Sequence, residues 1–328
     1  MTARPTRPGP DLAGAGLVAL AAACFGTLGP LSRFAGDAGV DSLTLVTWRA
    51  AIGALVVGSF IGVRLLAAGV RPVALRSLPA RDRRFMLAAA FANMVLNLAA
   101  FVAFERITIA LTLLVFYLYP AGVAVASTLW FGERLGRLHW AALAVSLGGM
   151  ALVVAGAQSL GELDALGIGL ALVAALAQVF YVLAARHGFA HVPGPQAAVL
   201  TMGGAALLYL LVALLAGSLG ALGQPVASGA AAVPVLLAGV IGAGIPTLAF
   251  ITGIRRLGPS QAAILATLEP VIGVGLAAWL LAEQPTVLQL AGGALILGSA
   301  VMLQLRHGVA ADHEAVASRD EKTEERPG

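Results

Sequence analysis

Glu269 is the residue whose type and position are most unusual in this 328-residue chain. It is the twelfth residue of an apolar run at 258–281, which at about 1.5 Å per helical residue places it roughly 16–18 Å along a helix, near the centre of a bilayer. A charge at that depth costs about 2.5–3.5 kcal/mol on insertion scales, so it marks a candidate functional site. The carboxylate must be paired, solvated in a cavity or protonated. We expect Glu269 to line a pathway, where it either binds a cationic group or carries a coupling proton.

Arg49 is the second charged residue inside an apolar run, the one at 43–66. It lies about 9 Å from the outer end of that run, counted at the helical rise. At that depth Arg49 could pair with Glu269 inside the protein. The alternative is that its long apolar stem lets the guanidinium snorkel to the outer headgroups.

A repeat connects these positions to others along the chain. Arg106, Pro120 and Glu133 recur 150 residues later as Arg256, Pro270 and Glu283. Proline inside an apolar run and glutamate at its end are rare, so the shared register indicates an internal duplication.

The duplicated register pairs Tyr119 with Glu269, each directly before a proline, Pro120 or Pro270. Proline removes a backbone donor and frees the carbonyl four residues earlier, so the two prolines predict matching helix kinks. Polar backbone at membrane depth persists only where protein or a water-filled cavity satisfies it. A kink that serves packing alone is the alternative.

Further polar side chains lie within the apolar runs. Asn93 and Asn97 are spaced i, i+4 and therefore share one helix face, and Asn97 aligns with Thr247. Such groups could instead bond neighbouring helices. The residues predicted to line a substrate pathway are Glu269, Tyr119, Arg49, Asn93, Asn97, Tyr117, Gln178, Tyr181 and Thr247.

Glu133 and Glu283 lie at the ends of apolar runs, where a charge is inexpensive, so either alone would be read as a solvated residue. Their duplication favours a gate or scaffold role over substrate binding.

The elements that must position these residues are membrane helices. Hydrophobic residues make up 59% of the chain and charged residues 11%, against about 25% charged in a typical soluble domain, and the mean hydropathy is +0.93. A bilayer core of about 30 Å requires about 20 apolar residues per helix. Runs near that length lie at 12–35, 43–66, 84–104, 107–131, 138–157, 165–186, 196–219, 232–254, 258–281 and 287–306. No run alternates apolar and polar residues in the pattern of a membrane β-barrel. The predicted fold is an all-α integral membrane protein with ten transmembrane helices.

The distribution of basic residues predicts the orientation of these helices. With the N-terminus inside, fourteen arginines near span ends fall on the cytoplasmic side, whereas Arg33 and Arg106 fall outside. Both termini should therefore be cytoplasmic. A repeat with five spans places its second copy upside down, so we expect two inverted repeats with a site near the midplane between them.

This organisation predicts four segments. They are a cytoplasmic N-terminal segment at 1–11, a first five-helix repeat at 12–157, a second, inverted repeat at 158–306 and a disordered cytoplasmic tail at 307–328.

The chain resembles the EamA-type carriers of the drug/metabolite transporter superfamily over residues 10–306. The motifs that carry the resemblance are Tyr119-Pro120 through Glu133-Arg134-Leu135, its counterpart Glu269-Pro270 through Glu283-Gln284, and Trp48-Arg49-Ala50-Ala51. The resemblance implies a secondary carrier of small metabolites or amphiphilic compounds such as amino acids or drug-like molecules, often an exporter. The second repeat departs from the pattern, because no arginine occurs near Thr201-Met202-Gly203.

Several other chemistries are absent. The only lysine is Lys322, so no G-x-x-x-x-G-K-[ST] phosphate loop exists and ATP-driven transport by this chain alone is excluded. No H-E-x-x-H zinc motif or G-x-S-x-G elbow occurs. We therefore predict no catalytic residues, metal or cofactor, and no basic tract suggests nucleic acid.

The expected partners are a small-molecule substrate, the lipid bilayer and a coupling proton. The alternatives to a carrier are a non-transporting scaffold or channel and, less favoured, an intramembrane lipid-modifying enzyme. Nineteen arginines with abundant Ala and Gly favour a bacterial origin and hence a bacterial inner membrane.

Overall fold

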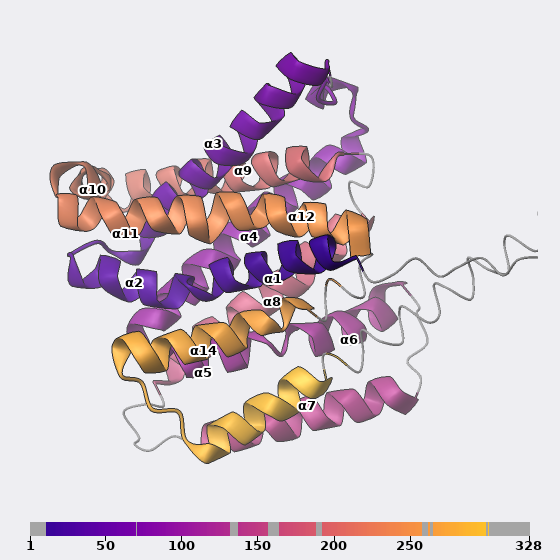
Figure 1. Cartoon of the computed structure of the whole chain (residues 1–328), viewed down its shortest axis with the longest axis vertical. Coiled ribbons are helices and arrows are strands. Elements are labelled where there is room, and N and C mark those ends of the chain that lie inside the picture. The colour runs from indigo at the N-terminus through magenta and orange to yellow at the C-terminus, as the bar shows by residue number, and fades with distance from the viewer. Residues whose placement is uncertain are drawn as a thin grey trace, which may run out of the picture.

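The structure is a computed structural model that describes residues 11–69, 71–131, 137–156, 164–187, 192–257, 262, 265–299 and 301. Within these residues every regular element is helical. Figure 1 shows the helices packed as one bundle in which most of them run roughly along a common direction.

The first part of the bundle contains the helices from α1 to α7. They are α1 (Leu12–Gly26), α2 (Leu28–Asp37), α3 (Ser42–Ala68), the short 3₁₀ helix η1 (Leu75–Ser77), α4 (Ala80–Arg106), α5 (Ile109–Phe116), α6 (Tyr119–Phe131) and α7 (Arg137–Ala155).

The second part begins with α8 and ends in a helix at Val287–Ser299. Its members are α8 (Ala165–His187), α9 (Gly194–Leu215), η3 (Leu219–Gly223), α10 (Gln224–Ala227), α11 (Gly229–Gly239), η4 (Val240–Gly244), α12 (Ile245–Leu257), α14 (Leu268–Leu281) and the helix Val287–Ser299.

In the described part of the chain, six helical stretches are long and apolar enough to cross a membrane. These are Leu12–Asp37, Ser42–Ala68, Ala80–Arg106, Ala165–Ala185, Gly194–Leu215 and Gly229–Leu257. The apolar helices at the other four predicted spans are shorter, from 10 to 17 residues. The class of all-helical membrane protein is therefore confirmed, whereas the count of ten spans stays a prediction.

The prolines were expected to kink continuous helices, but the structure interrupts the helices instead. Helix α5 ends at Phe116, Tyr117 and Leu118 form a turn, and Pro120 lies in the first turn of α6. Thr267 likewise forms a turn before α14, whose first turn contains Pro270. Proline is well accommodated in a first turn, because the N–H it lacks would have no intrahelical partner there.

A π-helical turn also positions the site. Helices α11 and α12 are joined by η4, whose sequence is Val-Ile-Gly-Ala-Gly. Single π turns inside α-helices often occur at functional sites, because their wider spacing changes which backbone groups are available. Pro246 lies four residues after Gly242 and has no N–H, so the carbonyl of Gly242 lacks its α-helical donor and accepts a hydrogen bond from Arg49 of α3.

Close helix contacts depend on small residues at a few points. A Cβ atom on Gly26 of α1 would lie 3.1 Å from the backbone oxygen of Glu269 and 3.1 Å from the nitrogen of Gly273. Glycine at this position therefore lets α1 approach the first turn of α14, where Glu269 lies. Large apolar side chains such as Leu66, Leu215 and Trp279 are exposed on the outside of the bundle, as expected for lipid-facing surfaces.

Two ion pairs link the duplicated arginines to helix N-termini. Arg106 at the end of α4 pairs with Asp164 before α8 at 2.7 Å, and Arg256 near the end of α12 pairs with Asp11 before α1 at 2.8 Å. Each aspartate also accepts hydrogen bonds from the backbone at the start of its helix. The equivalent arginines thus have equivalent partners.

Glu283 has a structural contact that fits its expected scaffold role. Its carboxylate accepts hydrogen bonds from the backbone N–H groups of Ile109 at 2.9 Å and Ala110 at 3.2 Å, and so caps α5. A carboxylate at a helix N-terminus is stabilised by the unpaired N–H groups and the helix dipole. Its repeat counterpart Glu133 lies outside the described residues.

Candidate functional site

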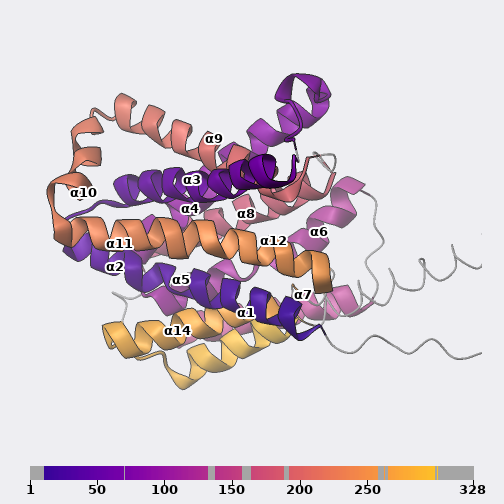
Figure 2. The ribbon, with the colours of Figure 1, turned by 45° about the horizontal axis from the view of Figure 1, so that its top comes forward.

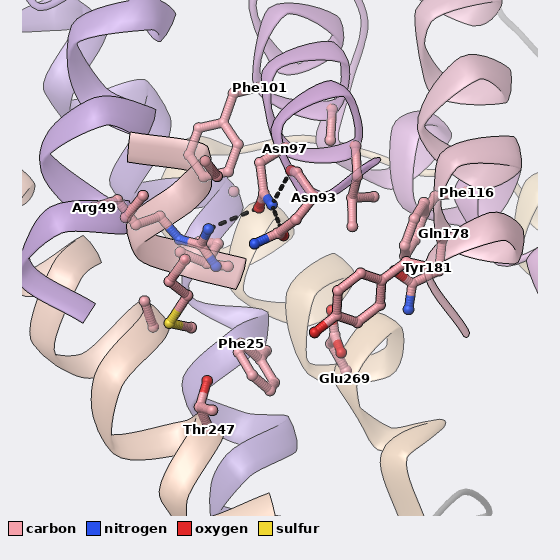
Figure 3. A pocket seen from close by; sticks show the side chains of 18 of the residues that line it. Phe25, Arg49, Asn93, Asn97, Phe101, Phe116, Gln178, Tyr181, Thr247 and Glu269 are labelled. Atoms are coloured by element: carbon pink, nitrogen blue, oxygen red, sulfur yellow. Dashed lines mark hydrogen bonds between the residues drawn. The ribbon is translucent and has the colours of Figure 1, made fainter. Parts of the chain in front are cut away.

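A cavity of about 260 Å³ opens between helices from both parts of the chain, and the nine residues predicted to line a pathway all line it (Figure 3). Arg49, Asn93, Asn97, Tyr117 and Tyr119 come from the first half of the chain. Gln178, Tyr181, Thr247 and Glu269 come from the second half. Among the described residues that line the cavity, Arg49 and Glu269 are the only charged ones.

Arg49 is held inside the bundle by groups from two other helical elements. Its Nη1 donates to Oδ1 of Asn97 in α4 at 2.7 Å, and its Nη2 donates to the carbonyl of Gly242 in η4 at 3.0 Å. The guanidinium also lies over the ring of Phe101, 5.6 Å from its centroid. Hydrogen bonds of this kind offset much of the cost of removing a charge from water.

Asn97 and Asn93 extend this network toward the cavity. Nδ2 of Asn97 donates to both the backbone oxygen and Oδ1 of Asn93, at 2.8 and 2.7 Å. The i, i+4 spacing that was expected to place both amides on one face of α4 therefore makes them direct partners. In Figure 3 the Asn93 side chain lies on the side of this network that faces Glu269.

The structure answers the two readings of Arg49 that the sequence left open. Only 8% of Arg49 is exposed, so it does not snorkel to the headgroups. Nor does it form an ion pair with Glu269 among the described contacts, because Asn97 and Gly242 take its hydrogen bonds. Its Nε is buried without a partner.

Glu269 lies on the other side of the cavity, in the first turn of α14. The helix N-terminus favours a negative charge there. Glu269 interacts with the hydroxyl of Tyr117 and, through charge, with Arg49. The hydroxyl of Tyr117 has one proton, which it donates either to the carboxylate of Glu269 or to the carbonyl of Ala266, 3.3 Å away.

An aromatic cluster surrounds the carboxylate. The rings of Phe116, Tyr117 and Tyr119 pack with centroid distances of 5.3–5.7 Å. Tyr181 from α8 and Phe25 from α1 also line the cavity beside Glu269 (Figure 3). Aromatic faces attract cations as well as apolar groups.

Several lining residues carried no signal in the sequence. Phe25, Phe101, Phe116, Thr201 and Tyr209 all contribute to the cavity. An aromatic ring in an apolar chain resembles any lipid-facing residue, so periodicity does not separate the two. Tyr209 also joins α9 to α4 by donating to the carbonyl of Met94 at 2.9 Å.

The arrangement separates two opposite charges by an aromatic, amide-lined space. Arg49 and the amide of Asn93 provide donors on one side, and Glu269 provides an acceptor on the other. Such a space suits a small molecule that carries a polar or cationic group on an apolar body.

The fold and the site together define a polytopic helical membrane protein with an internal cavity between two related halves. The sequence profile of the EamA-like transporter family matches residues 12–155 and again residues 165–305. The chain therefore belongs to the EamA-like transporter family and contains two EamA repeats. This confirms the resemblance that the proline and glutamate motifs indicated.

A comparison of structures agrees on the fold. The chain is similar to a solved structure described as "Crystal structure of protein", with a TM-score of 0.60 and 21% sequence identity over 90% of this chain and 98% of the other. At this identity the likeness concerns the fold alone. Comparison with curated proteins gave no significant match.

Proposed function

We propose that this protein is a secondary-active transporter that moves small metabolites or amphiphilic compounds across a bacterial inner membrane by alternating access, in the direction of export. The ten predicted spans form two inverted repeats in this proposal, with both termini in the cytoplasm. The observation that carries it is the cavity, because residues from both repeats line it and it contains the one acidic side chain among its described lining residues.

The end contacts support an inverted arrangement. Arg256 and Asp11 join α12 to α1 at the right-hand end of the bundle in Figure 1, whereas Arg106 directly precedes α5, whose start is capped by Glu283 at the left-hand end. Equivalent residues at opposite ends are what a pseudo-twofold axis in the membrane plane requires.

Glu269 is assigned the central role in this mechanism. Its carboxylate binds either a cationic group of the substrate or the coupling proton, and the aromatic rings around it hold the apolar body of the substrate. The amide network of Arg49, Asn97 and Asn93 binds polar acceptor groups on the other side of the cavity.

A growth screen with the full-length protein tests this proposal. Cells that express wild type, Glu269→Gln or Asp37→Asn are exposed to toxic amino acids, amines and amphiphilic drugs. Asp37 is an exposed carboxylate at the end of α2 that does not line the cavity, and is the matched control.

We expect wild type and Asp37→Asn to change resistance to at least one compound, and Glu269→Gln to abolish that change or its dependence on external pH. Normal transport by Glu269→Gln at every pH would remove both roles assigned to this carboxylate.

A further inference from the structure

A second cavity, of about 290 Å³, lies away from the central one, between the end of α3, the start of α9 and the end of α12. Arg64 of α3, Arg71 of the segment just after α3 and Arg255 of α12 line it, and all three are exposed. No carboxylate is among the described residues that line it. The ion pairs found in the described part of the chain are Arg106–Asp164 and Arg256–Asp11, and neither involves these three arginines.

Hydrogen bonds join two of the segments that line this pocket. The side chain of Gln196 accepts from the N–H of Val73 at 2.9 Å and donates to its carbonyl at 2.6 Å, so the segment that contains Arg71 is bound to the first turn of α9. Gln196 is buried. The start of α9 adds partial positive charge from the helix dipole, and its N-cap residue Pro193 has no side chain that caps it.

The position of the pocket indicates that its ligand comes from the membrane. Phe60 and Ile61 of α3 form its apolar side, and the neighbouring Val63 and Leu66 are 63% and 88% exposed on the outside of a membrane-length helix. The pocket therefore lies at the border between the lipid-facing apolar surface of α3 and a group of arginines. Figure 2 shows α3 beside α9 in the outer part of the bundle.

We propose that this pocket binds the phosphate headgroup of an anionic membrane lipid. Arg64, Arg71 and Arg255 contact the phosphate, and the side of the pocket formed by Phe60 and Ile61 contacts the beginning of the acyl chains. Guanidinium groups suit phosphate because they donate paired hydrogen bonds in a plane. Basic pockets between membrane helices are a recognised way to bind such headgroups.

Native mass spectrometry of the full-length protein in detergent, titrated with phosphatidylglycerol or phosphatidylcholine, tests the site. We expect one phosphatidylglycerol to bind about tenfold or more tightly than phosphatidylcholine. Replacing Arg64, Arg71 and Arg255 together by glutamine should weaken phosphatidylglycerol binding by roughly a hundredfold, since each arginine near a lipid surface contributes about 1 kcal/mol.

The matched control replaces Arg76, Arg83 and Arg137 by glutamine, which removes the same charge from exposed arginines outside the pocket. It should keep the wild-type affinity for phosphatidylglycerol. Equal losses in both triple variants would show general attraction to a basic surface and would overturn the proposal.

Two further arms complete the experiment. Arg71→Gln alone alters only a loop residue and should weaken phosphatidylglycerol binding about fivefold; no change would contradict the site even if the triple variant failed to fold. Displacement of the bound lipid by millimolar inorganic phosphate would contradict the lipid assignment and show a site for a free anion.

Discussion

Arg49 shows how one charged side chain can join three helical elements. It belongs to α3, donates to Asn97 in α4 and to Gly242 in η4, and lies over Phe101. Its removal would leave the partly buried amide oxygen of Asn97 and the buried carbonyl of Gly242 without this donor.

We predict that Arg49→Lys destabilises the protein although it preserves the charge. A lysine ammonium does not reproduce the planar fork that reaches Asn97 and Gly242 together, so at least one buried acceptor loses its partner. The expected cost is about 1–3 kcal/mol. Thermal unfolding in detergent measures it, with Arg76→Lys at an exposed position as control. Equal melting temperatures for wild type and Arg49→Lys would show that the network does not stabilise the fold.

The residues of the site were largely predictable from the sequence, because polar groups inside apolar helices must face one another or a cavity. Glu269, Arg49 and the Asn93–Asn97 pair were found in this way. The partner of Arg49 was not predicted, although Pro246, four residues after Gly242, is a signal in the sequence for a carbonyl that lacks its α-helical donor.

At the scale of the elements, the duplicated arginines fix the starts of two helices. Asp11 precedes α1 and binds Arg256, whereas Asp164 precedes α8 and binds Arg106. The hydrogen bond from Arg256, together with the N–H of Gly14, holds the pKa of Asp11 below its ordinary value of 3.8. At Asp164 burial opposes ionisation, but the N–H groups of Gly167 and Leu166 and the side chain of Arg106 outweigh it and lower the pKa.

These shifts predict acid sensitivity with a defined sign. A carboxylate whose pKa is lower in the folded state stabilises the fold above its ordinary pKa, and the stabilisation is lost as the pH falls through the folded value. The melting temperature of wild type should therefore fall as the pH falls below about 4. Asp11→Asn and Asp164→Asn should each reduce that loss by a small amount, because both pairs are partly exposed.

The Asp37→Asn variant, which removes a carboxylate from the exposed end of α2, is the control for this acid series. If it reduced the loss of melting temperature as much as Asp11→Asn or Asp164→Asn did, the end pairs would have no special part in acid stability.

Helix positions were predicted to within a few residues for most runs, because length and apolar composition determine them. The breaks between helices at the two prolines were not predicted. Proline was taken as the centre of a kink, whereas the helices stop before Pro120 and Pro270 and begin again with the proline in the first turn. The contact of Glu283 with the start of α5 is also a long-range contact that no local pattern indicates.

At the scale of the whole molecule, the two EamA repeats enclose a central cavity whose lining is asymmetric. The repeat register pairs Tyr119 with Glu269, so a neutral phenol and a carboxylate occupy equivalent positions beside the same space. A scaffold of related halves could exchange conformations, while the differing side chains define what binds. The proposed mechanism is alternating access around this cavity.

Counterflow in proteoliposomes tests this mechanism, with a labelled compound from the growth screen and the full-length protein. Liposomes preloaded with unlabelled compound should accumulate label transiently above its equilibrium level with wild type and Asp37→Asn. Glu269→Gln should lose this accumulation if the carboxylate binds the substrate, and should keep it if the carboxylate carries only the coupling proton. Equal uptake into loaded and empty liposomes would contradict alternating access, because a channel passes label at a rate that does not depend on substrate inside.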